Sequence, residues 1–143
     1  MIIPDVNLLV YAHDEAAPAH DAARSWWEDL LNGDGEVGLP WAVILGFVRV
    51  TTHPSILRSP LTVEEATTRV SGWLRRDNVL PLNPAHDHWQ RLRTFLGNLG
   101  SAGNLTTDAH IAALALEYRA EVQSNDSDFS RFPGLRWKNP LSD

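Results

Sequence analysis

Four aspartates stand where carboxylates could act together on a divalent metal ion. They are Asp5, Asp108, Asp126 and Asp128. The first follows the apolar run 1–4, the second lies on the apolar stripe of a helical segment, and the last two follow the strand-like run 120–124. Carboxylates gathered at one place repel one another unless they are protonated or bridged by cations. Because hard oxygen ligands without sulfur suit Mg²⁺ or Mn²⁺, the pattern predicts metal-assisted hydrolysis, first of a phosphodiester.

Each aspartate also has a simpler structural interpretation. Asp5 can cap the helix that follows it, and Asp108 can complement the dipole of the helix start at which it stands. Asp126 and Asp128 can form an Asx turn after their strand. The functional interpretation is stronger than the structural one for Asp108. The apolar residues at helical spacing around it place it on the face of its helix that turns toward the sheet. An unpaired charge is costly to bury there.

Length and composition predict one soluble domain over residues 1–143. Hydrophobic residues make up 43% of the chain and six are tryptophan, which is enough for a core. The absence of cysteine excludes disulfides, thiolate zinc sites and cysteine catalysis. No signal-type segment begins the chain and no apolar run approaches the roughly 18 residues of a membrane span. We expect a cytoplasmic protein that does not enter membranes.

The net charge of −6 argues against a surface that binds nucleic acid everywhere, but it allows a local basic rim. Eleven of the twelve basic residues are arginines, concentrated at 75–76, 91–93 and 131–136. Arginine suits phosphate because its planar fork donates two hydrogen bonds, although most of these arginines are expected to be solvated surface charges.

Hydrophobic periodicity predicts strands that alternate with helices. Strands are expected at 2–4, 36–39, 78–82, 120–124 and 135–138. Helices are expected at 6–13, 18–31, 40–51, 61–76, from 83–84 to the glycine-rich loop 97–103, and from about 106 to 118. Thr62 and Glu65 can form a capping box, and Thr106 or Thr107 is expected to cap the last helix. Such alternation indicates a parallel sheet with helices on both faces, whose ligands bind outside the carboxyl ends of the strands. Asp5 and Asp126 both fall at such ends.

The six histidines give no comparable pattern. His110 is two positions from Asp108 and therefore faces another side of its helix. His86 and His88 begin a helix and are expected to face solvent. A zinc site is not expected from these residues.

Four segments, taken in order, resemble the PIN-domain ribonucleases and, among them, the VapC toxins of bacterial toxin–antitoxin pairs. They are 4–9 (PDVNLL), 39–41 (LPW), 104–115 (NLTTDAHIAALA) and 124–141, which opens SNDSDFSRFPGLRW and closes on NPL. The last two are the most specific together, and the tail resembles a mycobacterial or actinobacterial branch.

The resemblance implies a three-layer α/β/α sandwich with a parallel sheet of four or five strands. It implies Mg²⁺- or Mn²⁺-dependent cleavage of RNA, inhibited by a cognate VapB-like antitoxin. It assigns catalytic and metal-ligand roles to Asp5, Asp108 and Asp126, with Asp128 as a further ligand. Supporting roles are expected for Asn7, which would hold the site through hydrogen bonds, and for Thr107 and Arg49.

One position departs from the family pattern. Many PIN nucleases carry a glutamate near the position of Gly46, within the helix expected at 40–51. Glycine inside a helix costs about 1 kcal/mol relative to alanine, so a close approach of substrate or of a neighbouring helix is expected there. The missing acid motivates an alternative, a PIN fold that binds RNA or a partner without cutting. A second alternative is a phosphatase-like hydrolase with Asp5 as nucleophile, although such enzymes usually place another aspartate where this chain has Asn7.

Two further expectations concern assembly. We expect a homodimer, and a groove in which the antitoxin lays an amphipathic helix and directs a cation toward the acidic site. Trp26 and Trp27 lie about 100° apart on one helix. Either both face the core, or one is exposed and anchors the partner.

Overall fold

The computed structural model describes residues 1–142 and contains a five-stranded sheet with all neighbouring strands parallel. The strands are β1 (Ile2–Pro4), β2 (Val37–Pro40), β3 (Val79–Leu82), β4 (Glu121–Gln123) and β5 (Arg136–Lys138). The helices are α1 (Val6–His13), α2 (His20–Asn32), α3 (Trp41–Thr51), α4 (Val63–Leu74), α5 (His88–Leu99) and α6 (Thr106–Tyr118), with the 3₁₀ turns η1 (Gly103–Leu105) and η2 (Ser127–Arg131).

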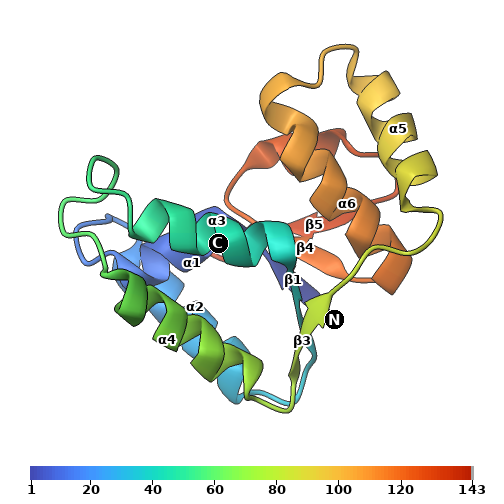
Figure 1. Cartoon of the computed structure of the whole chain (residues 1–143). Coiled ribbons are helices and arrows are strands. Elements are labelled where there is room, and N and C mark those ends of the chain that lie inside the picture. Colours follow the sequence, from blue (N-terminus) through green and yellow to red (C-terminus); the bar gives the residue numbers. More distant parts are fainter. Residues whose placement is uncertain (143) are drawn as a thin grey trace.

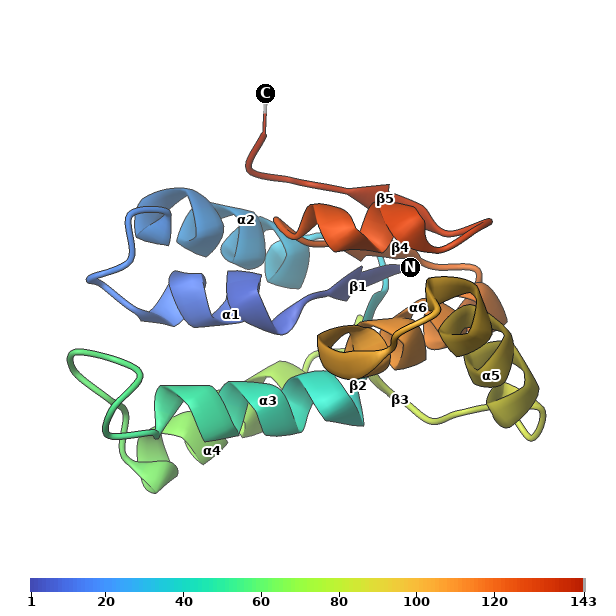
Figure 2. The ribbon, with the colours of Figure 1, turned by 90° about the horizontal axis from the view of Figure 1, so that it is seen from above.

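The strand order β3-β2-β1-β4-β5 places the first strand of the chain at the centre of the sheet. The helices α1 to α4 lie on one face, and α5 and α6 lie on the other (Figures 1 and 2). This is the expected three-layer α/β/α arrangement. The strand order reverses at β1, where β2 lies on one side and β4 on the other. Ligands of open parallel sheets bind at such a point.

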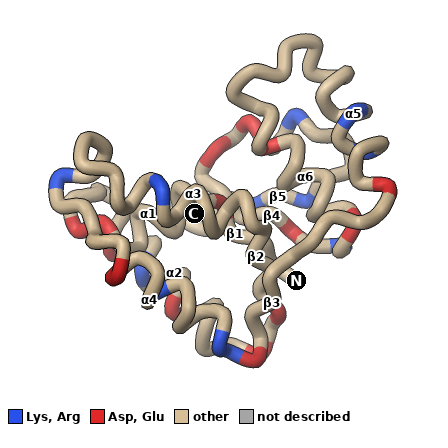
Figure 3. Tube along the Cα trace, viewed as in Figure 1, with Lys and Arg blue, Asp and Glu red and all other residues tan. Residues whose placement is uncertain are grey.

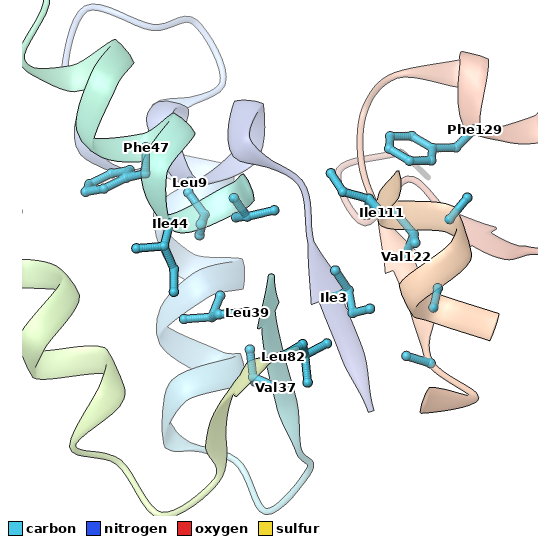
Figure 4. Close-up of a cluster of buried hydrophobic side chains, with 14 of the residues drawn as sticks. Ile3, Leu9, Val37, Leu39, Ile44, Phe47, Leu82, Ile111, Val122 and Phe129 are labelled. Atoms are coloured by element: carbon cyan, nitrogen blue, oxygen red, sulfur yellow. The ribbon is translucent and has the colours of Figure 1, made fainter. Parts of the chain in front are cut away.

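Apolar side chains from both layers of helices pack on the two faces of β1 and its neighbours. Ile3, at the centre, is fully buried. Figure 4 shows Leu9, Ile44 and Phe47 of α1 and α3 on one side, and Ile111, Val122 and Phe129 on the other. Because β1 and β2 are covered on both faces, their residues are continuously apolar rather than alternating. The core therefore fixes the ends of β1 and β4 relative to each other.

Local signals in the sequence explain several element boundaries. The predicted capping box at α4 is present, with the Thr62 hydroxyl accepting from Glu65 N at 3.0 Å and the Glu65 carboxylate accepting from Thr62 N at 3.1 Å. Helix α1 begins directly after Asp5, which caps it as expected. The positions of the strands and helices agree with the sequence-based prediction to within a few residues, except at α5.

Helix α5 begins at His88 rather than at residue 83 or 84. The preceding segment is held against α6, because Ala85 N donates to the Glu117 carboxylate at 2.8 Å and the Tyr118 hydroxyl donates to Asn83 O at 2.8 Å. The prediction for the start of α6 was also wrong in one detail. No threonine caps it, because η1 runs directly into the helix and the Thr106 hydroxyl donates to Gly103 O instead.

No helix among residues 1–142 is both long enough and apolar enough to cross a membrane.

Candidate metal centre

The parallel register of β1 and β4 brings Asp5 beside Ser124. Pro4 pairs with Gln123, the last residue of β4. The alignment continues past the strand ends, because Asp5 N donates to Gln123 O at 2.9 Å. The Ser124 hydroxyl donates to Asp5 Oδ2 at 2.7 Å, and Val6 N donates to Asp5 Oδ1 at 2.8 Å. Both oxygens of this buried carboxylate are therefore held in place by bonds to the protein.

Ser124 is a site residue that the sequence reasoning missed. It is fully buried, and its hydroxyl oxygen accepts from Asp126 N at 2.9 Å while its proton is donated to Asp5. One hydroxyl thus fixes the positions of two of the predicted ligands. Its place at the end of β4, opposite the end of β1, was the signal that could have identified it.

Asp126 and Asp128 follow β4 at the start of η2. Asp126 caps this turn, and its Oδ1 accepts from Asp128 N at 2.9 Å. The Asx-type turn that the sequence suggested is therefore present. It coexists with a position at the site, because Asp126 lies close enough to Asp5 to raise the pKa of the Asp5 carboxyl.

Asp108 approaches the same place from α6. Its pKa is raised to about 7, first by burial and then by the negative charges of Asp5, Asp126 and Asp128. Burial is also the main reason that the pKa of Asp5 is raised, although the hydrogen bonds from Ser124 and Val6 partly offset it. The structure thus brings all four predicted aspartates together at one end of the sheet. Figure 3 shows acidic segments gathered there, around α6 and the chain that follows β4.

The donor set suits a hard divalent cation. Within residues 1–142 no lysine, arginine or histidine forms an ion pair with any of the four aspartates, so their mutual repulsion is not balanced by the protein. The distances between the aspartates fit an ion less well. Among residues 1–142 no group of three or more acids or histidines is close enough together to hold an ion directly. Mg²⁺ keeps several of its waters in protein sites, which lets separated carboxylates share one ion through water.

The three supporting residues lie outside the hydrogen bonds of the site. Asn7, Thr107 and Arg49 are exposed. Within residues 1–142 the bonds to Asp5 come from Ser124 and Val6, so the supporting role of Asn7 stays a prediction.

Gly46 is buried in α3 and faces α1. A β-carbon at this position would lie 2.8 Å from Val6 Cγ2, which is closer than such atoms approach in proteins. Of the two reasons expected for this glycine, the close approach of a neighbouring helix is confirmed. A side chain at this position would point at Val6, the residue directly after Asp5.

The prediction that His88 faces solvent was wrong. It is buried between α5 and α6, where its Nδ1 lies 2.6 Å from Glu117 Oε2 and its Nε2 lies 2.8 Å from His110 Nδ1. His110 does face away from Asp108, as expected, and joins α6 to α5. The histidine pair therefore holds α5 and α6 together.

Neither tryptophan of α2 is an exposed anchor. Trp27 is only 3% exposed, and half-buried Trp26 donates through Nε1 to Gln123 Oε1 at 2.7 Å. The core-facing interpretation is confirmed. The exposed tryptophans are instead Trp41, at the start of α3, and Trp89 in α5.

Comparison with known proteins agrees with this architecture. The PIN domain family model matches residues 2–135. Ribonuclease VapC33 of Mycobacterium tuberculosis is 42% identical over 141 residues, covering 99% of each chain. Ribonuclease VapC37 of the same organism is 40% identical over 140 residues, covering 98% of this chain and 97% of the relative. The chain belongs to the PIN-domain family, in its VapC ribonuclease branch.

Solved structures confirm the fold at low sequence identity. VapBC2 from Rickettsia felis, crystallised with a DNA fragment from its promoter, superposes with a TM-score of 0.68 at 21% identity, covering 97% of this chain and 98% of that one.

Proposed function

We propose that this protein is the toxin of a toxin–antitoxin pair, a ribonuclease that hydrolyses RNA phosphodiester bonds with Mg²⁺ or Mn²⁺. The observation that carries the proposal is the meeting of Asp5, Asp108 and Asp126 at the carboxyl ends of β1 and β4, without a protein cation to neutralise them. The VapC ribonucleases that it resembles over nearly the whole chain support the choice of RNA.

The proposed division of roles follows from the geometry. Asp5, held rigidly by Ser124 and Val6, and Asp126, oriented by the turn of η2, would form the fixed part of the cation site. Asp108 would complete it from α6, and Asp128 would support a second ion. When bound, the ion would supply an activated water and neutralise charge on the phosphate. The exposed Arg49 and Arg131 would help position neighbouring phosphates.

Asp5 is poorly suited to the phosphatase-like alternative. Such enzymes usually place a second aspartate two residues after the nucleophile, and this chain has Asn7 at that position. The non-cutting alternative is favoured by Gly46, which leaves the site without the additional acid of many PIN nucleases.

A single assay on purified protein separates these functions. We expect cleavage of single-stranded RNA at millimolar Mg²⁺ or Mn²⁺, loss of cleavage in EDTA, and loss in Asp5→Asn, Asp108→Asn and Asp126→Asn variants that keep their circular dichroism spectra. RNA binding without cleavage would support the non-cutting fold. Hydrolysis of a phosphomonoester with phosphate trapped on Asp5 would support the phosphatase. Cleavage by a variant at the wild-type rate would remove that residue from the site.

We also propose a cytoplasmic homodimer that binds a VapB-like antitoxin. The surface that suits the dimer is the outer side of α3, where Trp41 and Leu45, one helical turn apart, are 46% and 64% exposed. Leu45→Glu should give a monomer in light scattering, whereas Leu116→Glu, on the far layer, should not.

The solved VapBC structure supports the proposal that this protein binds an antitoxin. Its binding should be weakened when the aspartates are neutralised, if it directs a cation toward them.

A further inference from the structure

Tyr11 lies beside the metal centre without a role in it. It stands one helical turn after Asn7 on α1, and Figure 2 shows α1 leaving the end of β1 beside the chain that follows β4. Its ring is partly buried and packs on the core, so the position of its hydroxyl is fixed. Asn125 Nδ2 donates to that hydroxyl over a long 3.4 Å. Asn125 in turn directly precedes Asp126, so the hydroxyl is placed at the rim of the site.

The hydroxyl keeps its proton available. The contact with Asn125 uses the hydroxyl oxygen of Tyr11 as acceptor, and within residues 1–142 the O–H has no acceptor of its own. Asn125 and Asn7 are exposed, and the amide of each has N–H groups left to donate. Tyr11 and Asn125 therefore present neutral donors beside Asp126, one of the four carboxylates.

Neutral donors are well suited to this position. A phosphodiester strand that approaches four aspartates is repelled, and arginine or lysine placed among them would pair with the carboxylates and compete with the metal ion. A phenol and amides bind phosphate oxygens without neutralising the acids. A hydrogen bond to a charged oxygen is also stronger than one between neutral groups.

We propose that the Tyr11 hydroxyl, together with the Asn125 amide, binds a non-bridging oxygen of the phosphate next to the one that is cleaved. Tyr11 is then a substrate-binding residue that sets the register of the RNA strand on the site. The proposal rests on the proposed ribonuclease function and names a contact that the aspartates do not supply.

The test uses Tyr11→Phe, which removes one oxygen atom and keeps the packed ring. The matched control is Tyr118→Phe, in the second tyrosine of the chain, whose hydroxyl donates to Asn83 O away from the site. We expect the KM for a short single-stranded RNA to rise about tenfold in Tyr11→Phe with kcat nearly unchanged, because a bond present in both ground and transition states is lost. Tyr118→Phe should keep the wild-type KM.

Binding measured without cleavage provides the second readout. In an Asp108→Asn background, fluorescence anisotropy with labelled RNA should show about tenfold weaker binding on adding Tyr11→Phe, with the same dependence of log K on log salt, because no charge is removed. Equal KM values for the two tyrosine variants, or a reduced salt slope, would overturn the proposal. If the wild-type protein cleaves no RNA, the ribonuclease function fails, and the anisotropy comparison alone then decides whether Tyr11 binds the strand.

Discussion

Ser124 shows how one uncharged atom can hold two charged groups in place. Replacing it with alanine leaves Asp5 Oδ2 and Asp126 N without their partner in a fully buried position. We expect Ser124→Ala to lower metal affinity and RNA cleavage by roughly 10- to 100-fold, as for other residues that orient ligands. Urea unfolding should show a loss of about 1–3 kcal/mol. Ser124→Thr, which keeps the hydroxyl, should recover much of the activity. Full activity in the alanine variant would show that the bond does not orient Asp5.

Asp108 should make the metal-free protein less stable as pH rises. Its folded pKa of about 7 lies above its ordinary value of 3.8, so between these pH values the folded state holds a proton that the unfolded state has already lost. Stability is therefore greatest below about pH 4 for this group and falls until about pH 7. Because Asp108 is partly exposed and screened, we expect its contribution to be about 1–2 kcal/mol. In EDTA, Asp108→Asn should be more stable than wild type at pH 8 and equal to it near pH 4. If the stability of the wild-type protein in EDTA did not change between pH 4 and pH 8, the raised pKa of Asp108 would be contradicted.

At the scale of elements, two helical glycines should respond in opposite directions. A β-carbon at Gly46 would lie 2.8 Å from Val6 Cγ2, whereas one at Gly72, in α4, would meet nothing within 4 Å. Gly72→Ala should stabilise the protein by about 0.5–1 kcal/mol because alanine favours helix. Gly46→Ala should destabilise it by about 1–3 kcal/mol, because Val6 is short and cannot move aside. Urea denaturation measures both.

The same contact changes what is expected of an acid at this position. Gly46→Glu would force α1 and α3 apart beside Asp5, so we expect weaker metal binding in calorimetry, and not the tighter binding that a restored ligand would give. Tighter binding by a folded variant would show that the glutamate bypasses Val6 and reaches the cation.

Local sequence signals predicted most helices and strands well. The predictions failed where contacts between residues far apart in the sequence decide the structure. The bounds of α1 and the capping box of Thr62 depend on neighbours in sequence, so both could be predicted. The late start of α5 depends on Glu117 and Tyr118, which lie on another helix. His88 is buried for the same reason. Ser124 required the register of β4 against β1, which periodicity does not contain.

At the scale of the whole molecule, metal binding should couple to folding. The four aspartates converge only in the folded state, so a cation binds that state and not the unfolded chain. Adding Mg²⁺ or Mn²⁺ should raise the melting temperature in proportion to the logarithm of metal concentration. The rise should be much smaller in Asp108→Asn and unchanged in Gly72→Ala. An equal rise in wild type and Asp108→Asn would place the stabilising ion elsewhere.

The central position of β1 has a consequence for biosynthesis. Asp5 leaves the ribosome before the hydroxyl that orients it, which comes 119 residues later in the chain. Both neighbours of β1 in the sheet are also synthesised after it. Until then, a growing chain carries the first carboxylate without the partners that complete the cation site. The proposed nuclease would be assembled only after β4 and Asp126 have emerged from the ribosome.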